Sequence, residues 1–451
     1  MADVIVLGFF SEQPQALTAA GELGRRGFQR TGQVHKNHAG AIEIRDPFRR
    51  RRSFASALFA LAGGSLAALA LAVLRPRSPA LAGVLPGLAL VLVGALAGWA
   101  LAALWSQRSR FGLDRELFAD HARWLAPDET VLILQVPPDS LAEAVEVMRE
   151  GVEVPPIIFF LHPKRELESP RPRPAGSTLT LPEIEEHARR LAQEQRLDAG
   201  LLPSPEVLRR VEAARRWVHH ICQDLSLAGR LEETTSPAAE WLLDNEYVVE
   251  SNVLDVQLNL PQRYFRQLPV LSGSGLPRIY ALADELVSHT ELRIDTEPIE
   301  GFLEAYQAAQ PLTIGELWAF PQMLRIALIE GIAQLALRAL SDLRQREQAD
   351  FWANRLMTVS RRDPNQLFGM MAELTRAHPS PSPYFASQLV GHLYDEEEAL
   401  APVQSWLERT YHRPLGELNL REQTRQTQDQ ISISNAFASL RQLALDRKSV
   451  V

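Results

Sequence analysis

The N-terminal third of the chain contains two segments with the same order of apolar patterns. The first begins with VIVLGFF, continues with apolar residues at helical spacing over residues 17–23, and ends in a glycine. The second begins with TVLILQV, continues with a helical pattern over residues 141–148, and also ends in a glycine. Further strands are predicted at AIEIR and PPIIFFL. This repeated strand-helix-strand order predicts a ferredoxin-like sandwich formed by residues 1–52 and 106–163.

Two long apolar stretches separate the halves of this sandwich. Residues 53–74 form 22 positions without a charge, and residues 80–105 form 26 more. At about 1.5 Å per residue, each helix would be long enough to cross a hydrocarbon core of about 30 Å. Residues 53–105 are therefore predicted to form a transmembrane helical hairpin, with a buried hairpin in a soluble core as the alternative.

The arginines around these stretches predict an orientation. Seven of them lie on the outer flanks, and only Arg75 and Arg77 lie in the connecting loop. Positive residues favour the cytoplasmic side, so both termini and the helical domain that follows are expected in the cytoplasm, with the hairpin in a bacterial inner membrane. Membrane lipid is thus an expected partner, and residues 49–52, all arginine, suit contact with anionic headgroups.

The rest of the chain is predicted to be a linker followed by helices. Residues 164–180 are rich in proline, serine and charge, which is typical of a linker. Apolar residues then recur at helical spacing and predict an all-α domain over residues 181–445. Thr313 and Glu316 form a capping box that opens a helix predicted to continue to about Arg344, with Pro321 inside it. The predicted fold class is α+β: a ferredoxin-like sandwich interrupted by a transmembrane hairpin and followed by an all-α domain.

Composition narrows the class of protein. A length of 451 residues suggests about three domains, and 46% apolar with 23% charged residues indicates a folded chain. The one cysteine, Cys222, excludes intramolecular disulfides and metal sites that need several cysteines. The net charge of -8 argues against a nucleic-acid partner.

Four separated blocks of the helical domain resemble, in the same order, the N-terminal region of bacterial cyclic β-1,2-glucan synthases. The resemblance covers about residues 236–445, and its blocks begin with AAEWLLDNEYVVESN, GLPRIYALADELVSH, FLEAYQAAQPLTIGELW and ISISNAFASLRQLA. It implies a glycosyltransferase domain further along the polypeptide, which uses UDP-glucose and a divalent metal, and a glycoside phosphorylase domain beyond it. Residues 3–162 resemble small two-span bacterial membrane proteins of unknown function, and this second resemblance implies no chemistry.

The sequence assigns no catalytic residue, cofactor site or metal site to this chain. It contains no Asp-x-Asp pair for a nucleotide-sugar metal, and Arg215-Arg216-Trp217 lacks the glutamine of a Gln-x-x-Arg-Trp motif. UDP-glucose and its metal are therefore expected to bind the downstream domain. His219 and His220 beside Cys222 are a candidate metal cluster, but neighbouring positions on a helix diverge by about 100°, which favours a partly exposed helical face.

Seven residues within the resembling blocks are candidates for contact with β-1,2-glucan. Aromatic side chains together with arginine suit a sugar-binding groove, and packing with helix capping is the favoured alternative. The seven are Trp241, Arg263, Tyr264, Arg278, Tyr280, Glu316 and Trp318.

The last residues differ from the rest of the chain. Residues 446–451 read DRKSVV and contain Lys448, one of three lysines, so they are predicted to be a non-native tail. We therefore expect the truncated N-terminal membrane anchor and helical scaffold of a cyclic β-1,2-glucan synthase, whose downstream domains are partners on the same polypeptide. The alternative is a complete two-span membrane adaptor or sugar-sensing protein without catalytic activity.

Overall fold

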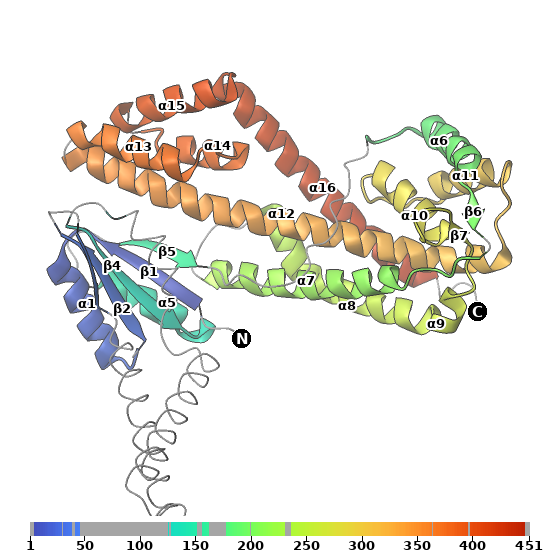
Figure 1. Ribbon diagram of the computed structural model, residues 1–451, viewed down its shortest axis with the longest axis horizontal. Coiled ribbons are helices and arrows are strands. Elements are labelled where there is room, and N and C mark those ends of the chain that lie inside the picture. The colour runs from blue at the N-terminus through green and yellow to red at the C-terminus, as the bar shows by residue number, and fades with distance from the viewer. Residues whose placement is uncertain are drawn as a thin grey trace, which may run out of the picture. The chain divides into compact units, whose positions relative to one another are not determined.

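The computed structural model describes residues 4–28, 30–37, 41–45, 125, 128–150, 156–161, 177–198, 200–230, 236–362, 364–395 and 397–446. The chain divides into two compact units, Met1–Pro163 and Lys164–Val451. The first contains a small sheet with two described α-helices, and the second is helical except for one short pair of strands (Figure 1).

A five-stranded antiparallel sheet forms the first unit, in the order β3-β2-β4-β1-β5. Its strands are β1 (Val4–Phe10), β2 (Thr31–Lys36), β3 (Ile42–Arg45), β4 (Thr130–Val136) and β5 (Ile157–Leu161). Helix α1 (Gln13–Arg25) follows β1, and a 3-10 turn η2 (Pro138–Ser140) with α5 (Leu141–Arg149) follows β4. Strand β1 lies between β4 and β5, and it pairs Val6 with Leu134 of β4 and Leu7 with Phe159 of β5. The two α-helices contact each other and cover fully buried residues such as Leu7 and Leu23.

Strand β2 is the element that the sequence analysis missed in this sheet. AIEIR was predicted as a strand of the sandwich, but Ile42–Arg45 is an added edge strand, and β2 lies between it and β4. The segment TGQVHK has one large aliphatic residue, Val34, which is 2% exposed. Its strand conformation therefore depends on pairing with β4, which supplies the backbone hydrogen bonds on one side, and not on an apolar pattern of its own.

The predicted fold class is wrong as stated. The described chain is mostly helical with a small sheet, and none of its described helices combines the length and the apolar character needed to cross a membrane. The 49-residue helix α12, for example, carries charged side chains along its length. The predicted hairpin at residues 53–105 lies outside the described residues, as do residues 447–451 of the predicted tail.

The second unit contains fourteen described elements from Leu181 to Asp446. They are α6 (Leu181–Glu194), β6 (Leu197–Asp198), α7 (Glu206–Arg230), α8 (Pro237–Asn259), α9 (Gln262–Phe265), β7 (Val270–Leu271), α10 (Arg278–His289), α11 (Thr296–Gln307), α12 (Ile314–Arg362), η3 (Pro364–Gln366), α13 (Leu367–Ala377), α14 (Pro383–His392), α15 (Glu397–Tyr411) and α16 (Leu415–Asp446). Strands β6 and β7 pair antiparallel.

Helix α12 runs through this unit and packs against α7, α8, α10, α14 and α16 (Figure 1). Its side chains Ile326, Leu328, Ile329 and Ile332 are fully buried. The predicted capping box is confirmed, because Thr313 Oγ1 accepts a hydrogen bond from Glu316 N over 3.2 Å while Thr313 N donates to Glu316 Oε2 over 2.9 Å. The helix continues past the predicted end to Arg362, because it packs further along against α13 and α14.

A charged junction joins α12 to α16. Arg425 of α16 contacts three carboxylates at 2.5 to 2.7 Å, and they belong to Asp342, Glu422 and Asp429. Arg338 contacts Asp429 at 2.8 Å from its other side. Burial raises the pKa of Asp342 to about 6, which Arg425 partly offsets and the carboxylates of Glu422 and Asp429 reinforce. The junction therefore holds an acid whose ionisation costs folding free energy.

This raised pKa predicts a pH-dependent stability. A carboxyl that binds its proton more tightly in the folded chain stabilises the fold fully below its unfolded pKa of about 4, and the contribution is lost as pH rises through about 6. The difference between 3.8 and about 6 corresponds to about 3 kcal/mol at most. Asp342→Asn should remove this loss, so urea unfolding followed by circular dichroism should show a flatter pH profile than wild type between about pH 4 and pH 7.

The exposed aspartate Asp244 of α8 supplies the control for this substitution. Asp244→Asn should unfold with the wild-type pH profile. Equal profiles for wild type and Asp342→Asn would contradict the burial argument.

Candidate functional site

A buried ion pair joins α10 to the beginning of α12. Arg278 is the first residue of α10, and its Nε donates to Glu316 Oε1 over 2.7 Å while its Nη2 donates to Glu316 Oε2 over 2.6 Å. The two side chains are 3% and 0% exposed. Two parallel hydrogen bonds to one carboxylate fix both the distance and the angle between the groups.

The carboxylate of Glu316 also caps its own helix. Its Oε2 accepts hydrogen bonds from Thr313 N and Thr313 Oγ1, both over 2.9 Å. Glu316 therefore joins the first turn of α12 to α10 with a single group. Burial opposes the charge of Arg278, but Glu316 outweighs this effect and raises the pKa of the guanidinium.

Hydrogen bonds extend from this pair to α6 and α11. Arg278 Nη2 donates to Pro311 O over 3.2 Å, and Gln310 Nε2 donates to Gln195 O over 2.9 Å. Tyr306 of α11 donates to Gln195 Oε1 over 2.8 Å, and burial raises the pKa of this phenol. Four elements distant in sequence thus meet around the Arg278 guanidinium.

A second polar cluster joins α7, α10 and α12. Tyr280 donates to Glu330 Oε2 over 2.7 Å, and Arg210 Nη2 donates to the same oxygen over 2.9 Å and to the Tyr280 hydroxyl over 2.8 Å. The Arg210 guanidinium also lies 5.5 Å from the centre of the Tyr280 ring. This cluster pairs Glu330 Oε2 with two donors in a nearly buried region, whereas Glu330 Oε1 is buried without a hydrogen-bond partner among the described residues. The arrangement is structural, because it holds three helices together.

The seven candidate residues fall into three environments. Arg278, Tyr280 and Glu316 are at most 2% exposed, so they offer a ligand no surface in this conformation. Trp241 and Tyr264 are half-buried and pack against the core, and the Tyr264 hydroxyl donates to Gly315 O. The two exposed members are Arg263 and Trp318, the latter 78% exposed. Contact of any of the seven with glycan stays a prediction.

The three members of the candidate metal cluster, His219, His220 and Cys222, face different residues. Cys222 is buried with its Sγ 3.8 Å from Leu242 O, and burial raises the pKa of the thiol to about 12. A thiol with this pKa carries its proton at neutral pH and is a poor metal ligand. His219 instead lies 2.6 Å from Glu246 Oε1, and His220 faces Gln223.

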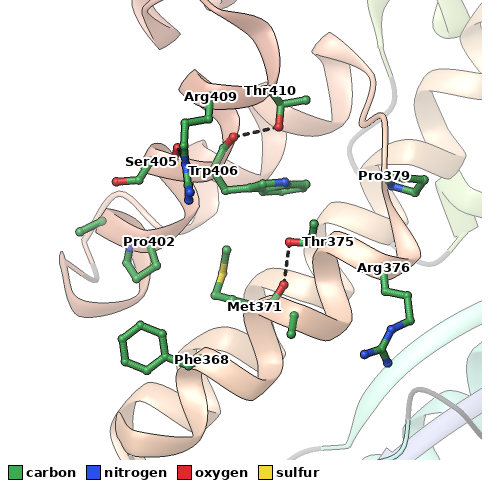
Figure 2. Close-up of a pocket in the computed structure, with 12 residues that line it drawn as sticks. Phe368, Met371, Thr375, Arg376, Pro379, Pro402, Ser405, Trp406, Arg409 and Thr410 are labelled. Atoms are coloured by element: carbon green, nitrogen blue, oxygen red, sulfur yellow. Dashed lines mark hydrogen bonds between the residues drawn. The ribbon is translucent and has the colours of Figure 1, made fainter.

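An open groove lies between α13 and α15, where the sequence analysis identified no site. Its volume is about 990 Å³, and Figure 2 shows Met371 and Phe368 on α13 across from Trp406 and Pro402 on α15. The lining residues are Phe368, Met371, Ala372, Thr375, Arg376, Pro379, Ala401, Pro402, Ser405, Trp406, Arg409 and Thr410. The signal in the sequence is the helical spacing of the apolar residues Phe368, Met371 and Ala372, which also fits an ordinary core helix.

The groove suits binding and not acid-base chemistry. The described residues that line it supply apolar faces, three hydroxyls and the guanidinium groups of Arg376 and Arg409, without a carboxylate or an imidazole. Thr375 and Thr410 donate their hydroxyl protons to the backbone of their own helices, over 2.8 and 2.9 Å. Their oxygens still have accepting capacity toward the groove.

Comparison with known proteins relates part of this chain to the cyclic β-glucan synthases. The related protein is the cyclic β-(1,2)-glucan synthase NdvB of Rhizobium meliloti (strain 1021), with 35% identity over 213 residues. The match covers 46% of this chain and 7% of the length of that synthase. No family model matches the chain. The comparison confirms the resemblance that the four sequence blocks indicated.

Loss of one partner of the Arg278–Glu316 pair should lower the stability of the fold. Arg278→Met leaves the Glu316 carboxylate buried without its partner, which should lower the free energy of unfolding by about 3–5 kcal/mol. Arg189→Met removes an exposed arginine that contacts Glu185 and Glu186, and should cost less than about 1 kcal/mol. Urea unfolding of both variants measures the difference, and equal costs would show that the buried pair is not a structural centre.

Proposed function

We propose that the helical unit is a scaffold within a protein that makes cyclic β-(1,2)-glucan. The observation that supports this proposal is the 35% identity over 213 residues to a synthase of that glucan. The arrangement of the unit agrees with a supporting role, since its most constrained polar side chains, Arg278 and Glu316, fasten helices to one another. UDP-glucose and the metal that holds its diphosphate are assigned to other parts of such a synthase.

A region exchange tests the scaffold role. Residues 164–446 of this chain, placed into the Rhizobium meliloti synthase instead of the corresponding region, should retain synthesis of cyclic β-(1,2)-glucan, measured by chromatography of cell extracts. Arg278→Met in the exchanged region should lower the amount of folded protein, and with it the glucan yield, several-fold. Arg189→Met is the matched control and should leave the yield unchanged. Loss of synthesis with a stable, folded exchange protein would contradict the proposal.

A second function, glucan binding, is favoured by the groove between α13 and α15. Pyranose rings have apolar faces that stack on aromatic side chains, and hydroxyl groups that bond to arginine and threonine. The groove combines Phe368 and Trp406 with Arg376 and Arg409, and its volume is in the upper range of small-molecule sites. We infer that this groove holds a segment of β-1,2-glucan.

Calorimetric titration of the full chain with β-1,2-glucan tests this inference. Phe368 is 79% exposed, so Phe368→Ala removes a stacking face with little effect on the core, and Arg409→Ala removes a donor. Each change should weaken binding about 10-fold, or about 1.4 kcal/mol. Trp318→Ala is the control because Trp318 is exposed on α12, outside the groove lining. If Trp318→Ala alone weakened glucan binding, the glucan site would lie at the helical blocks that resemble the glucan synthases and not in the groove. Absence of glucan binding by wild type would refute the inference.

A further inference from the structure

Two histidines and a glutamate converge where α6 lies beside α10. His187 comes from α6, and Glu285 and His289 are one helical turn apart on α10. Nε2 of His187 lies 3.1 Å from Glu285 Oε2, and Nε2 of His289 lies 3.6 Å from the same oxygen. The two imidazole rings meet edge to face with centroids 4.8 Å apart. Three groups that commonly bind metals thus point to one position.

The backbone around Ser177 determines which nitrogen of His289 is available. Nδ1 of His289 lies 2.8 Å from Ser177 O, and because a carbonyl only accepts hydrogen bonds, Nδ1 carries the proton. In the neutral ring the lone pair is then on Nε2, which faces the Glu285 carboxylate. Two acceptors that face each other are stabilised by a cation between them, and either a metal ion or a proton on Nε2 can supply it. A hydrogen bond from the far nitrogen to a backbone carbonyl is also the usual support of a histidine that binds a metal.

The spacing of the three ligand atoms suits a tetrahedral ion. Zinc bonds of about 2.0–2.2 Å place neighbouring ligand atoms about 3.4 Å apart. The distances from Glu285 Oε2 to the two histidine nitrogens, 3.1 and 3.6 Å, lie on either side of this value, and all three ligand atoms lie within 4.8 Å of one another. The histidine side chains are 19% and 18% exposed and that of Glu285 is 41% exposed, so an ion can enter and a water molecule can complete the coordination.

We propose that His187, Glu285 and His289 bind one transition-metal ion of the Zn²⁺ class, which fastens α6 to α10. Two imidazoles and one carboxylate favour Zn²⁺ over Mg²⁺ or Ca²⁺, which take oxygen ligands. The site is therefore distinct in chemistry from a magnesium-type site on a nucleotide sugar. The inference rests on these side chains alone and is independent of the scaffold and glucan-binding roles.

The ion reinforces a junction that hydrogen bonds already define. Leu179 N donates to His289 O over 3.0 Å, and Thr178 Oγ1 donates to Glu291 Oε1 over 2.7 Å. The segment that leads into α6 therefore runs along the end of α10. An ion bound by His187 of α6 and by Glu285 and His289 of α10 adds a further connection, so α6 should detach less readily when the ion is bound.

A second group in the described part of the chain, His219, Glu246 and Glu250, has the same residue types but different partners. Glu250 accepts a hydrogen bond from Arg215 Nη1 over 3.0 Å, so a cation already occupies its oxygens. Nδ1 of His219 faces Glu246, and its Nε2 faces the Gln223 amide at 2.9 Å. This group supplies a matched control with a histidine that has no free nitrogen.

Calorimetry on the full chain, freed of metal with a chelator, tests the site. Titration with ZnCl₂ should show one ion bound per chain through this cluster, and MgCl₂ should not compete. His187→Ala and His289→Ala should each weaken Zn²⁺ binding at least about 10-fold, while His219→Ala should bind as wild type does. Zn²⁺ should also raise the Tm of wild type and not that of His289→Ala.

Cobalt spectroscopy separates a built site from ions held loosely at surface groups. Co²⁺ bound to wild type should give the intense visible absorption of a tetrahedral ion, and Glu285→Gln, which keeps the size of the side chain, should lose it. This conservative variant keeps the proposal testable if an alanine variant fails to fold. The assignment would be overturned if wild type and His187→Ala bound Zn²⁺ equally well, or if only His219→Ala lost Zn²⁺ affinity. The cluster would then be an ion pair between histidine and glutamate that joins α6 to α10.

Discussion

The helical unit depends on the buried contact between Arg278 and Glu316. The two charges are removed from water together, so each has an acceptable environment only while the other is present. Glu316 also caps α12, and the hydrogen bonds around Arg278 reach the end of α11 and Gln195. The position of α10 therefore sets the beginning of the longest described helix. Lysine could not replace Arg278, because it lacks the planar pair of donors that the carboxylate accepts.

The buried Arg325 and the half-buried Arg210 and Arg425 make similar connections along α12. Arg210 joins α7 to Tyr280 and Glu330, and Arg325 donates to Asn252 Oδ1 of α8 over 3.1 Å and to Leu443 O of α16 over 2.5 Å. Arg425 connects α16 to Asp342 further along. Apolar packing alone allows helices to slide with modest cost, whereas hydrogen-bonded charges have defined partners. The result is a core whose helices are fixed in register.

Structural features that depend on neighbouring residues could be predicted from the sequence. Features that depend on contacts between residues far apart in the chain could not. The capping box at Thr313 and Glu316 was predicted because its two residues are three positions apart. The partner of Glu316 could not be predicted, since Arg278 is 38 positions away and no local pattern links them. Strand β2 was missed because TGQVHK has too few apolar residues, and α12 was predicted too short because its C-terminal part is stabilised by α13 and α14. His187 and Glu285 are 98 positions apart, so their meeting also required the fold.

The buried centre and the binding chemistry occupy different parts of the unit. Around Arg278 and Glu316 the donors and acceptors already satisfy one another, and a ligand would have to break these bonds to enter. The groove residues Phe368 and Arg409, and the metal-binding atoms of His187 and Glu285, lie on helices at the margin of the core and retain exposed surface. Ligands can therefore bind at the margin without cost to the packing at the centre. The hydrogen bonds that exclude a ligand from Arg278 also hold the helices at the margin of the core in place.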